Sequence, residues 1–207
     1  MGLLDQMLSW VNRIVILISV VLLTLTTLSK DVPLSQATMR VGHLCSFSVW
    51  FGTSVWVSFV AGVVLIRAIN IDNFGLAQAK LFDAYFKFSL LCLAFAGFTA
   101  AALTSTSFSA GQSDGEGFAA MRATPFFVAL ASVVANLVFF SPQTTVTMME
   151  RRRVCRELGV ERDSKDPQVR KLSKRFGMFH GITNLLNLVA LACGCVHLVA
   201  LAERLSL

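Results

Sequence analysis

A polar face at helical spacing stands inside the last apolar stretch of this chain. His180, Asn184 and Asn187 occupy positions i, i+4 and i+7, and Asn136 lies at a similar depth in the preceding apolar stretch. The first three residues share one face of a helix. Polar side chains are costly at membrane depth, so all four are candidates for a functional site. The alternative is that the imidazole and the amides only hydrogen-bond neighbouring helices, which stabilises the fold.

A second polar set stands at one end of the same predicted bundle. Lys80, Asp83 and Lys87 recur at i, i+3 and i+7, so they can pair along a helix. This spacing is typical either of anchoring at the membrane interface or of a site for an anionic group. We predict that both sets meet in one cluster, either a structural knot of hydrogen bonds or the floor of a small pocket. The predicted cluster contains Arg67, Gln78, Lys80, Asp83, Asn136, Thr144, Thr145, His180, Asn184 and Asn187.

The sequence lacks the residue sets on which catalysis usually depends. It has no paired carboxylates within an apolar stretch, no Ser, His and Asp set that would form a triad, and no Gly-rich phosphate loop. His180 alone, flanked by amides and Gly181, is insufficient for acid–base catalysis. We therefore predict a protein that is not an enzyme and has no cofactor.

Soft metal ligands are present but form no motif. Cys45, Cys92, Cys193 and Cys195 stand in apolar stretches, and Cys155 stands in a basic loop. Thiolates suit Cu(I) or a platinum species. However, Cys193 and Cys195 point to different faces of a helix, and a buried Cys commonly packs as a small apolar residue. The sequence predicts no metal site and no secreted disulfide framework.

Long uncharged runs define the elements that must position these residues. Residues 41–66, 88–113, 123–149 and 176–202 contain no Asp, Glu, Lys or Arg. Each run is long enough to cross a bilayer, and continuous apolar runs of this length cross it as helices. We predict an all-α integral membrane protein with a four-helix transmembrane domain over residues 42–207.

A fifth, shorter run precedes these four. Residues 14–29 follow Arg13, whose long side chain can reach back to the headgroups. The run predicts an extra N-terminal transmembrane helix within residues 1–29. A cleaved signal peptide is the alternative, because the small residues Thr27 and Ser29 end the run.

The positive charges are distributed unevenly between the two ends of the predicted bundle. With five spans, one side holds Arg13, Arg67, Lys80 and ten basic residues between 151 and 175, whereas the other side holds four basic residues. Such an excess predicts that the thirteen-residue side is inside, with the N-terminus inside and the C-terminus outside. The net charge of +6 is therefore explained by membrane topology, and no nucleic-acid partner is predicted.

The basic segment has signals for two helices. Pro142 marks a kink after the fourth run, and the helix then continues to a stop at Gly159. Asp166 and Pro167 begin another helix that runs into the last span. We predict a basic helical hairpin over residues 142–175, whose segment 151–175 contacts anionic lipid headgroups. Residues 107–122 are expected to form an outside loop, with Thr124 and Pro125 starting the fourth span.

Small residues predict where helices pack closely. Ser54, Ser58 and Gly62 recur at i, i+4 and i+8, and Gly181 follows the polar His180. Small side chains let two backbones approach, which is how helices associate within lipid. We expect these four residues to serve helix packing.

Several short motifs resemble the transmembrane protein 205-like family. The resemblance covers about residues 42–200, and its motifs fall mostly on the predicted inside face. They are His43-Leu44, Trp56-Val57-Ser58-Phe59-Val60-Ala61-Gly62, Arg67, Phe74-Gly75-Leu76, Gln78, Lys80-Leu81-Phe82, Tyr85-Phe86, Pro142, Thr144-Thr145, Met148, Lys165-Asp166-Pro167, Phe176, His180-Gly181 and Asn187-Leu188.

The resemblance implies a membrane domain of four spans whose molecular activity is poorly defined, with a suggested link to the handling of platinum compounds. Two features depart from the family pattern. Asp83 stands where members often have a proline after Lys-Leu-Phe, and the run 14–29 would be an additional span. The resemblance therefore implies more about the fold than about the function.

The function predicted from these observations is a non-catalytic accessory or scaffold subunit of a larger membrane complex, such as a respiratory, ATP synthase or photosynthetic assembly. Its expected partners are anionic membrane lipids and other membrane protein subunits. The alternative is a small transporter or a protein that handles soft metals. The mitochondrial inner membrane is the favoured location, with the thylakoid, endoplasmic reticulum and plasma membrane as alternatives.

Overall fold

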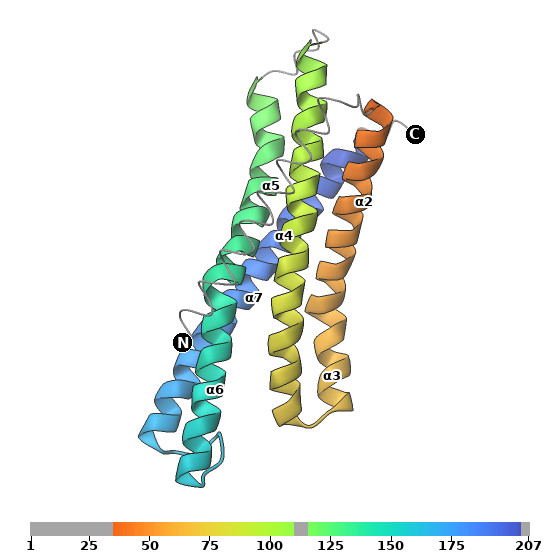
Figure 1. Ribbon diagram of the computed structural model, residues 1–207. Helices are drawn as coiled ribbons and strands as arrows, with labels where there is room; N and C mark the ends of the chain where they lie inside the picture. The colour runs from red at the N-terminus through yellow and green to blue at the C-terminus, as the bar shows by residue number, and fades with distance from the viewer. Residues whose placement is uncertain (1–34, 110–115, 204–207) are drawn as a thin grey trace, which may run out of the picture.

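The protein is a bundle of long helices. The computed structural model describes residues 35–109 and 116–203, and every regular element in these ranges is helical. Four helical segments in the described chain are long and apolar enough to cross a membrane, which confirms the predicted four core spans (Figure 1). The N-terminal helix predicted within residues 1–29 lies outside the described residues.

Two of the four segments contain a π-helical turn. The first consists of α2 (Gln36–Val55), η1 (Trp56–Ala61) and α3 (Gly62–Ala68), and α4 (Ile71–Ser109) follows it. The third consists of α5 (Glu116–Ala135), η2 (Asn136–Phe140) and α6 (Ser141–Leu158). The fourth is α7 (Pro167–Ala202). A π-helical turn inside an α-helix frequently marks a functional region.

The helices form two arms that meet toward the end opposite the α6–α7 loop. Helix α2 packs along α4, whereas α7 packs along α5 and α6 and meets α2 in its C-terminal half, around Gly194 and His197. Helix α7 therefore crosses the bundle diagonally (Figure 1). The α3–α4 arm and the α6–α7 arm separate toward the end of the molecule that carries the α6–α7 loop (Figure 1).

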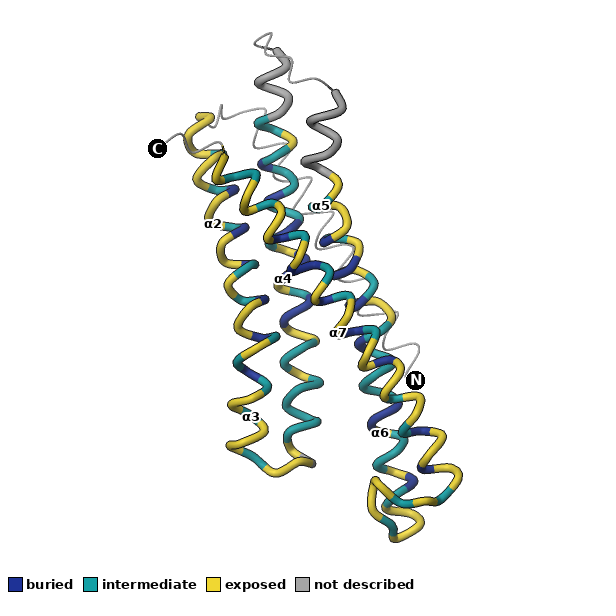
Figure 2. Tube along the Cα trace, turned by 180° about the vertical axis from the view of Figure 1, so that it is seen from behind, coloured by how far each residue is buried: buried dark blue, intermediate teal, exposed yellow. Residues whose placement is uncertain are grey.

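Aromatic residues fill the region where the arms meet. Trp50, Phe86, Leu93 and Val133 are almost completely buried there. Large apolar residues are also exposed on the outer faces, and Figure 2 shows how many positions along α2 and α7 are exposed. Because lipid tails are as apolar as leucine, such exposed residues are expected in a membrane bundle, and close packing rather than water exclusion holds its helices together.

A smaller core holds the basic hairpin together. Val154 from α6 packs against Val169 and Leu172 from α7, and these three residues form a cluster separate from the main core. Gly159 ends α6 with φ of 66°, in the left-handed region that favours glycine. Asp166 caps α7 by accepting hydrogen bonds from the backbone N–H groups of residues 168 and 169. These are the positions at which the sequence predicted a stop and a start.

Of the two prolines of the third segment, Pro125 does not mark the helix start that the sequence predicted, whereas the helix continues past Pro142 to Leu158 as predicted. Pro125 lies inside α5, because the helix begins nine residues earlier at Glu116, and the predicted start at Thr124 is wrong. The predicted outside loop over residues 107–122 is also wrong at both ends, since α4 extends to Ser109. At Pro142 the helix continues after η2, where the N–H of Ser141 donates to the carbonyl of Asn136, five residues back.

Candidate functional site

A cleft of about 1200 Å³ lies between the two arms. The cleft extends from η1 and the middle of α7 to the α6–α7 loop. It therefore opens toward the end of the molecule that carries the basic hairpin, which we call the basic end. Its lining consists of Val57, Ser58, Gly62, Ile71, Phe74, Gly75, Leu76, Gln78, Ala79, Phe82, Ser141, Thr144, Thr145, Met148, Arg151, Arg152, Cys155, Arg156, Gly159, Val160, Glu161, Arg162, Phe176, His180, Thr183 and Asn184. We call this space the arm cleft.

The two walls of the arm cleft differ in chemistry. The wall from the first two segments is mostly apolar, with Val57, Phe74 and Phe82 as large members. The wall from α6 and α7 carries hydroxyl, amide and guanidinium groups, such as Thr144 and Asn184. The cleft is therefore amphipathic, and a ligand with one polar and one apolar part would match it.

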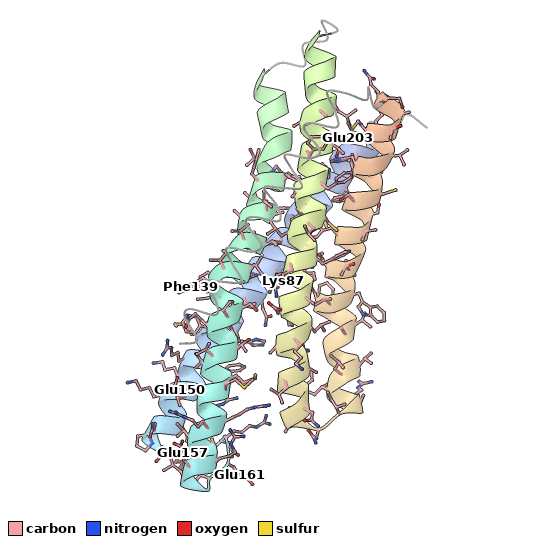
Figure 3. The ribbon with its side chains drawn as sticks, in the orientation of Figure 1. Lys87, Phe139, Glu150, Glu157, Glu161 and Glu203 are labelled. Atoms are coloured by element: carbon pink, nitrogen blue, oxygen red, sulfur yellow. The ribbon has the colours of Figure 1, made fainter. Side chains whose placement is uncertain are left out.

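Four arginines and one glutamate line the open end. Arg151, Arg152, Arg156 and Arg162 come from the last turns of α6 and the following loop, and Glu161 is the one acid among the lining residues of the described chain. Figure 3 shows Glu161 near the tip of the hairpin. An anion is favoured at this end because guanidinium groups bind phosphate and carboxylate well.

The side chain of Arg151 is held in place by α7. Its guanidinium carbon lies 4.7 Å from the centre of the Phe176 ring, and its Nη1 makes a long contact of 3.5 Å with the hydroxyl of Ser173. Its Nε is buried and has no hydrogen-bond partner within residues 35–109 and 116–203. A cation stacked on an aromatic ring is oriented without being neutralised, so Arg151 keeps donors for an anion.

Arg152 reaches across the cleft to α4. A Cβ built on Gly75 would lie 2.9 Å from Arg152 Nη2 and 2.9 Å from Met148 Sδ. A Cβ at this position would require the flexible ends of these two side chains to shift. The close approach links α4 with α6 at the open end of the cleft.

Hydrogen bonds join η2 and α6 to α7 on the polar wall. Asn136 donates from Nδ2 to the carbonyl of Thr183 over 3.1 Å, and the hydroxyls of Thr144 and Thr183 lie 3.4 Å apart. Thr144 donates to the carbonyl of Phe140 over 2.8 Å. These contacts fix the position of the π-helical turn against the last span.

His180 lies on the α7 side of the cleft. Its ring stacks on Phe176 with 5.5 Å between ring centres, and its Nε2 lies 3.1 Å from Asn184 Nδ2. Both His180 and Asn184 are exposed in the bundle. They are therefore accessible from the cleft rather than part of a buried core.

A deeper network closes the cleft at its end away from the α6–α7 loop. The hydroxyl of Tyr85 donates to Asn187 Oδ1 over 2.7 Å and lies 3.0 Å from the Ser54 hydroxyl. Asn187 donates from Nδ2 to the Ser58 hydroxyl over 2.7 Å. This network links three segments, and Ser58 also faces the cleft. Sequence analysis did not assign Tyr85 to the site, although a tyrosine within an apolar helix needs a partner for its hydroxyl.

The ten residues of the predicted cluster fall into three places. Gln78, Thr144, Thr145, His180 and Asn184 line the arm cleft. Asn136 and Asn187 are buried behind it. The remaining three, Arg67, Lys80 and Asp83, are exposed and do not line the cleft, so their predicted place in the cluster is wrong. The face of α4 that carries Asp83 pairs this residue with Lys87 instead.

The four small residues that were predicted to serve helix packing also lie in different surroundings. Ser54 is buried against Tyr85, and a Cβ on Gly62 would lie 3.2 Å from Gln78 Nε2, so the stripe of α2 and α3 faces α4. Gly181 is exposed, and a Cβ there would meet no atom of the described chain within 4 Å. Its predicted role in helix packing is wrong, because it lies on the outward face of α7.

A separate polar contact lies at the end of the bundle opposite the α6–α7 loop. His43 Nε2 is 3.0 Å from His197 Nε2, and His43 Nδ1 is 3.1 Å from the Thr99 hydroxyl. This contact links α2, α4 and α7 far from the cleft. Sequence analysis missed His197, which stands alone in an apolar run. No three His, Cys, Asp or Glu side chains converge on a possible metal position in the described ranges.

Comparisons with known proteins identify relatives. Residues 45–153 match the family model described as a domain of unknown function, DUF4149. Over 181 residues the chain is 30% identical to "Transmembrane protein 205" from Danio rerio, an alignment that covers 81% of this chain and 93% of that protein. No solved structure matches significantly. The family-model match includes the wall of the arm cleft from the first two segments and the first part of the α6 wall, and it ends within α6.

Proposed function

Since this chain belongs to the transmembrane protein 205 family, we propose that it serves as a non-catalytic accessory or scaffold subunit of a larger membrane assembly. The α6–α7 hairpin is its docking element. The main observation in support is that this basic hairpin has a hydrophobic core of its own, formed by Val154, Val169 and Leu172. A separately packed, capped hairpin is rigid before any partner arrives, so docking costs little conformational entropy.

The outward surface of the hairpin is strongly basic. Lys165, Arg170, Lys171 and Lys174 are exposed and line a shallow depression, in which Asp163 is the one acid. We call these four residues the hairpin face. A surface of this sign steers acidic partners toward it and raises the rate of encounter. The partner we propose is an acidic segment of another membrane subunit, and anionic headgroups compete for the same surface.

The proposed topology places the hairpin inside. The described basic residues at this end include Arg67 and Lys80 as well as the hairpin, whereas Arg40 stands at the opposite end. Cytoplasmic or matrix loops carry such an excess. Single cysteines at Lys171 and Gln36 test the orientation: labelling of both from one side of a sealed vesicle would contradict it. The mitochondrial inner membrane remains the favoured location as a prediction.

Removal of the hairpin charges tests the scaffold role. The native membrane is solubilised in mild detergent and separated on a native gel, where the wild-type chain should migrate within a large complex. Replacing all four residues of the hairpin face with Gln should release the chain from that complex. The matched control neutralises Arg67 and Lys80, which lie at the same end but outside the hairpin. Migration of the wild-type chain alone, or unchanged assembly of the four-residue variant, would contradict the proposal.

A small transporter is the second candidate, and the arm cleft is the observation that favours it. The cleft opens at one end only, because the Tyr85 network and the aromatic core that contains Trp50 lie between it and the outside end. A transport site would need a second opening. Handling of soft metals stays a prediction from the cysteines.

A further inference from the structure

We propose that the arm cleft binds the headgroup of an anionic lipid that carries a free hydroxyl beside its phosphate, taken from the leaflet on the basic side. The lipid tails stay in the bilayer. The shared chemistry is a phosphate ester of a polyol, and phosphatidylglycerol is a simple example.

The charges in the cleft select an anion. Four arginines and one glutamate line the open end, and guanidinium groups bind phosphate oxygens through two parallel hydrogen bonds. Arg151 lies on the Phe176 ring with its buried Nε unpartnered in the described chain. Buried donors in native proteins are almost always satisfied, so an acceptor is expected next to this group.

A second unpartnered group points to a hydroxyl. Gln78 lines the cleft, and its Oε1 is buried without a hydrogen-bond partner in the described residues. A hydroxyl both donates to an amide oxygen and accepts from an amide N–H, so it satisfies the side chain in either orientation. Gln78 stands three residues after Gly75, where Arg152 Nη2 approaches α4. The two positions are one helical turn apart, roughly 4.5 Å along the axis. The hydroxyl would therefore lie beside the phosphate.

The depth of the cleft matches the headgroup region. Arg151 stands two residues after the end of the uncharged run 123–149. Its guanidinium therefore lies at the membrane interface. Thr144 lies seven residues earlier on α6, about 10 Å deeper along the helix. Phe74 and Phe82 form the opposite, apolar wall. A headgroup entering at this level would meet guanidinium and hydroxyl groups on one side and leave its tails against apolar surface.

This site is distinct from the hairpin face. Arg151 and Gln78 do not belong to that surface, and none of its four residues lines the arm cleft. Failure of the docking proposal therefore leaves the lipid proposal standing, and the reverse also holds.

Native mass spectrometry of the full chain in neutral detergent tests the proposal. Three lipids are added separately: phosphatidylglycerol, phosphatidylethanol, which has the same charge but no hydroxyl, and zwitterionic phosphatidylcholine. We expect one bound phosphatidylglycerol, held about threefold to tenfold more tightly than phosphatidylethanol, as one added hydrogen bond predicts. Equal binding of all three lipids would overturn the proposal.

Two variants locate the site. Arg151→Gln should weaken phosphatidylglycerol binding at least about tenfold, because a charge-assisted hydrogen bond is lost. Arg170→Gln removes the same charge from the hairpin face. It should change lipid binding less than about twofold, because a single exposed charge contributes little to binding. Gln78→Leu should abolish the preference over phosphatidylethanol while leaving phosphatidylethanol binding unchanged. Equal losses in the two arginine variants, or an intact preference in Gln78→Leu, would refute the site.

Two further measurements remove ambiguity. Glycerophosphoglycerol, the headgroup without tails, should fail to displace the lipid at equal concentration, and displacement would instead identify a soluble polyol phosphate as the ligand. Thermal melting of each variant without lipid shows whether it is folded. If Arg151→Gln melts early, Arg156→Gln replaces it, since Arg156 also lines the open end, and unchanged binding in that folded variant would refute the proposal.

Discussion

At the scale of residues, polar side chains in this bundle serve two different purposes. Tyr85, Ser54, Ser58 and Asn187 satisfy one another in the interior, whereas His180 and Asn184 bond to each other on the exposed wall of the cleft. Sequence spacing grouped Asn187 with His180 because both lie on related positions of one helix. It could not separate them, because burial depends on which neighbouring helix faces each turn.

Replacing Asn187 with Ala should destabilise the bundle. The change removes hydrogen bonds to Tyr85 and Ser58 and should lower the free energy of unfolding by about 1 kcal/mol, since such bonds in membrane proteins contribute about 0.6 kcal/mol each. The melting temperature in detergent should fall by about 2–4 °C. The matched control is Asn184→Ala, which removes the exposed amide bonded to His180. Equal melting of the two variants would contradict the assignment of the interior network.

Glycine offers a second comparison at this scale. A Cβ on Gly194 would lie 2.8 Å from Phe51 Cδ2 and 3.1 Å from Trp50 Cζ3, whereas a Cβ on Gly181 would meet nothing within 4 Å. Gly194→Ala should therefore cost about 1–3 kcal/mol through overpacking. Gly181→Ala should gain up to about 1 kcal/mol from helix propensity. Thermal melting of both variants measures the difference, and a stabilised Gly194→Ala would show that α2 and α7 do not pack this closely.

At the scale of elements, local signals located some helix ends and misplaced others. Gly159 and Asp166 mark true ends because each acts through its own backbone or side chain. Thr124 and Pro125 carry an equally good start signal, yet α5 begins at Glu116. A proline within an apolar helix is tolerated where neighbouring helices and local adjustments satisfy the freed carbonyl. The π-helical turns left no signal that the sequence alone could reveal.

The cap of α7 should determine how firmly the hairpin is held. Asp166→Ala removes the side-chain acceptor for two backbone N–H groups and should destabilise the start of α7 by about 1 kcal/mol. Hydrogen exchange of residues 167–172 should become faster in this variant. Asp163→Ala is the control, because Asp163 lies in the same loop without capping a helix. Unchanged exchange in Asp166→Ala would mean that the small hydrophobic core alone holds the hairpin.

At the scale of the whole molecule, the four spans follow from uncharged runs, and the basic hairpin follows from a charge run with helix signals at its ends. The arm cleft does not follow from either. It exists because α7 crosses the bundle diagonally and diverges from α3 and α4 toward the basic end, as Figure 1 shows. Crossing angles depend on how side chains from two helices interlock, and a single sequence does not reveal which faces meet.

The molecule as a whole is therefore organised around its basic end. The hairpin face and the arm cleft both lie there, while in the described residues the opposite end is closed by the contact between His43 and His197 and by aromatic packing. We infer that partners and ligands meet the protein at the basic end.

Site-specific photo-crosslinking in the native membrane tests this claim most directly. A photoreactive residue is placed either at Lys171 on the hairpin face or at Gln36 at the outside start of α2, and both positions are exposed. We expect a discrete crosslinked protein from position 171 and none from position 36, and the crosslink should be lost when Lys165, Arg170 and Lys174 are replaced by Gln. A discrete crosslink from position 36 alone would contradict it.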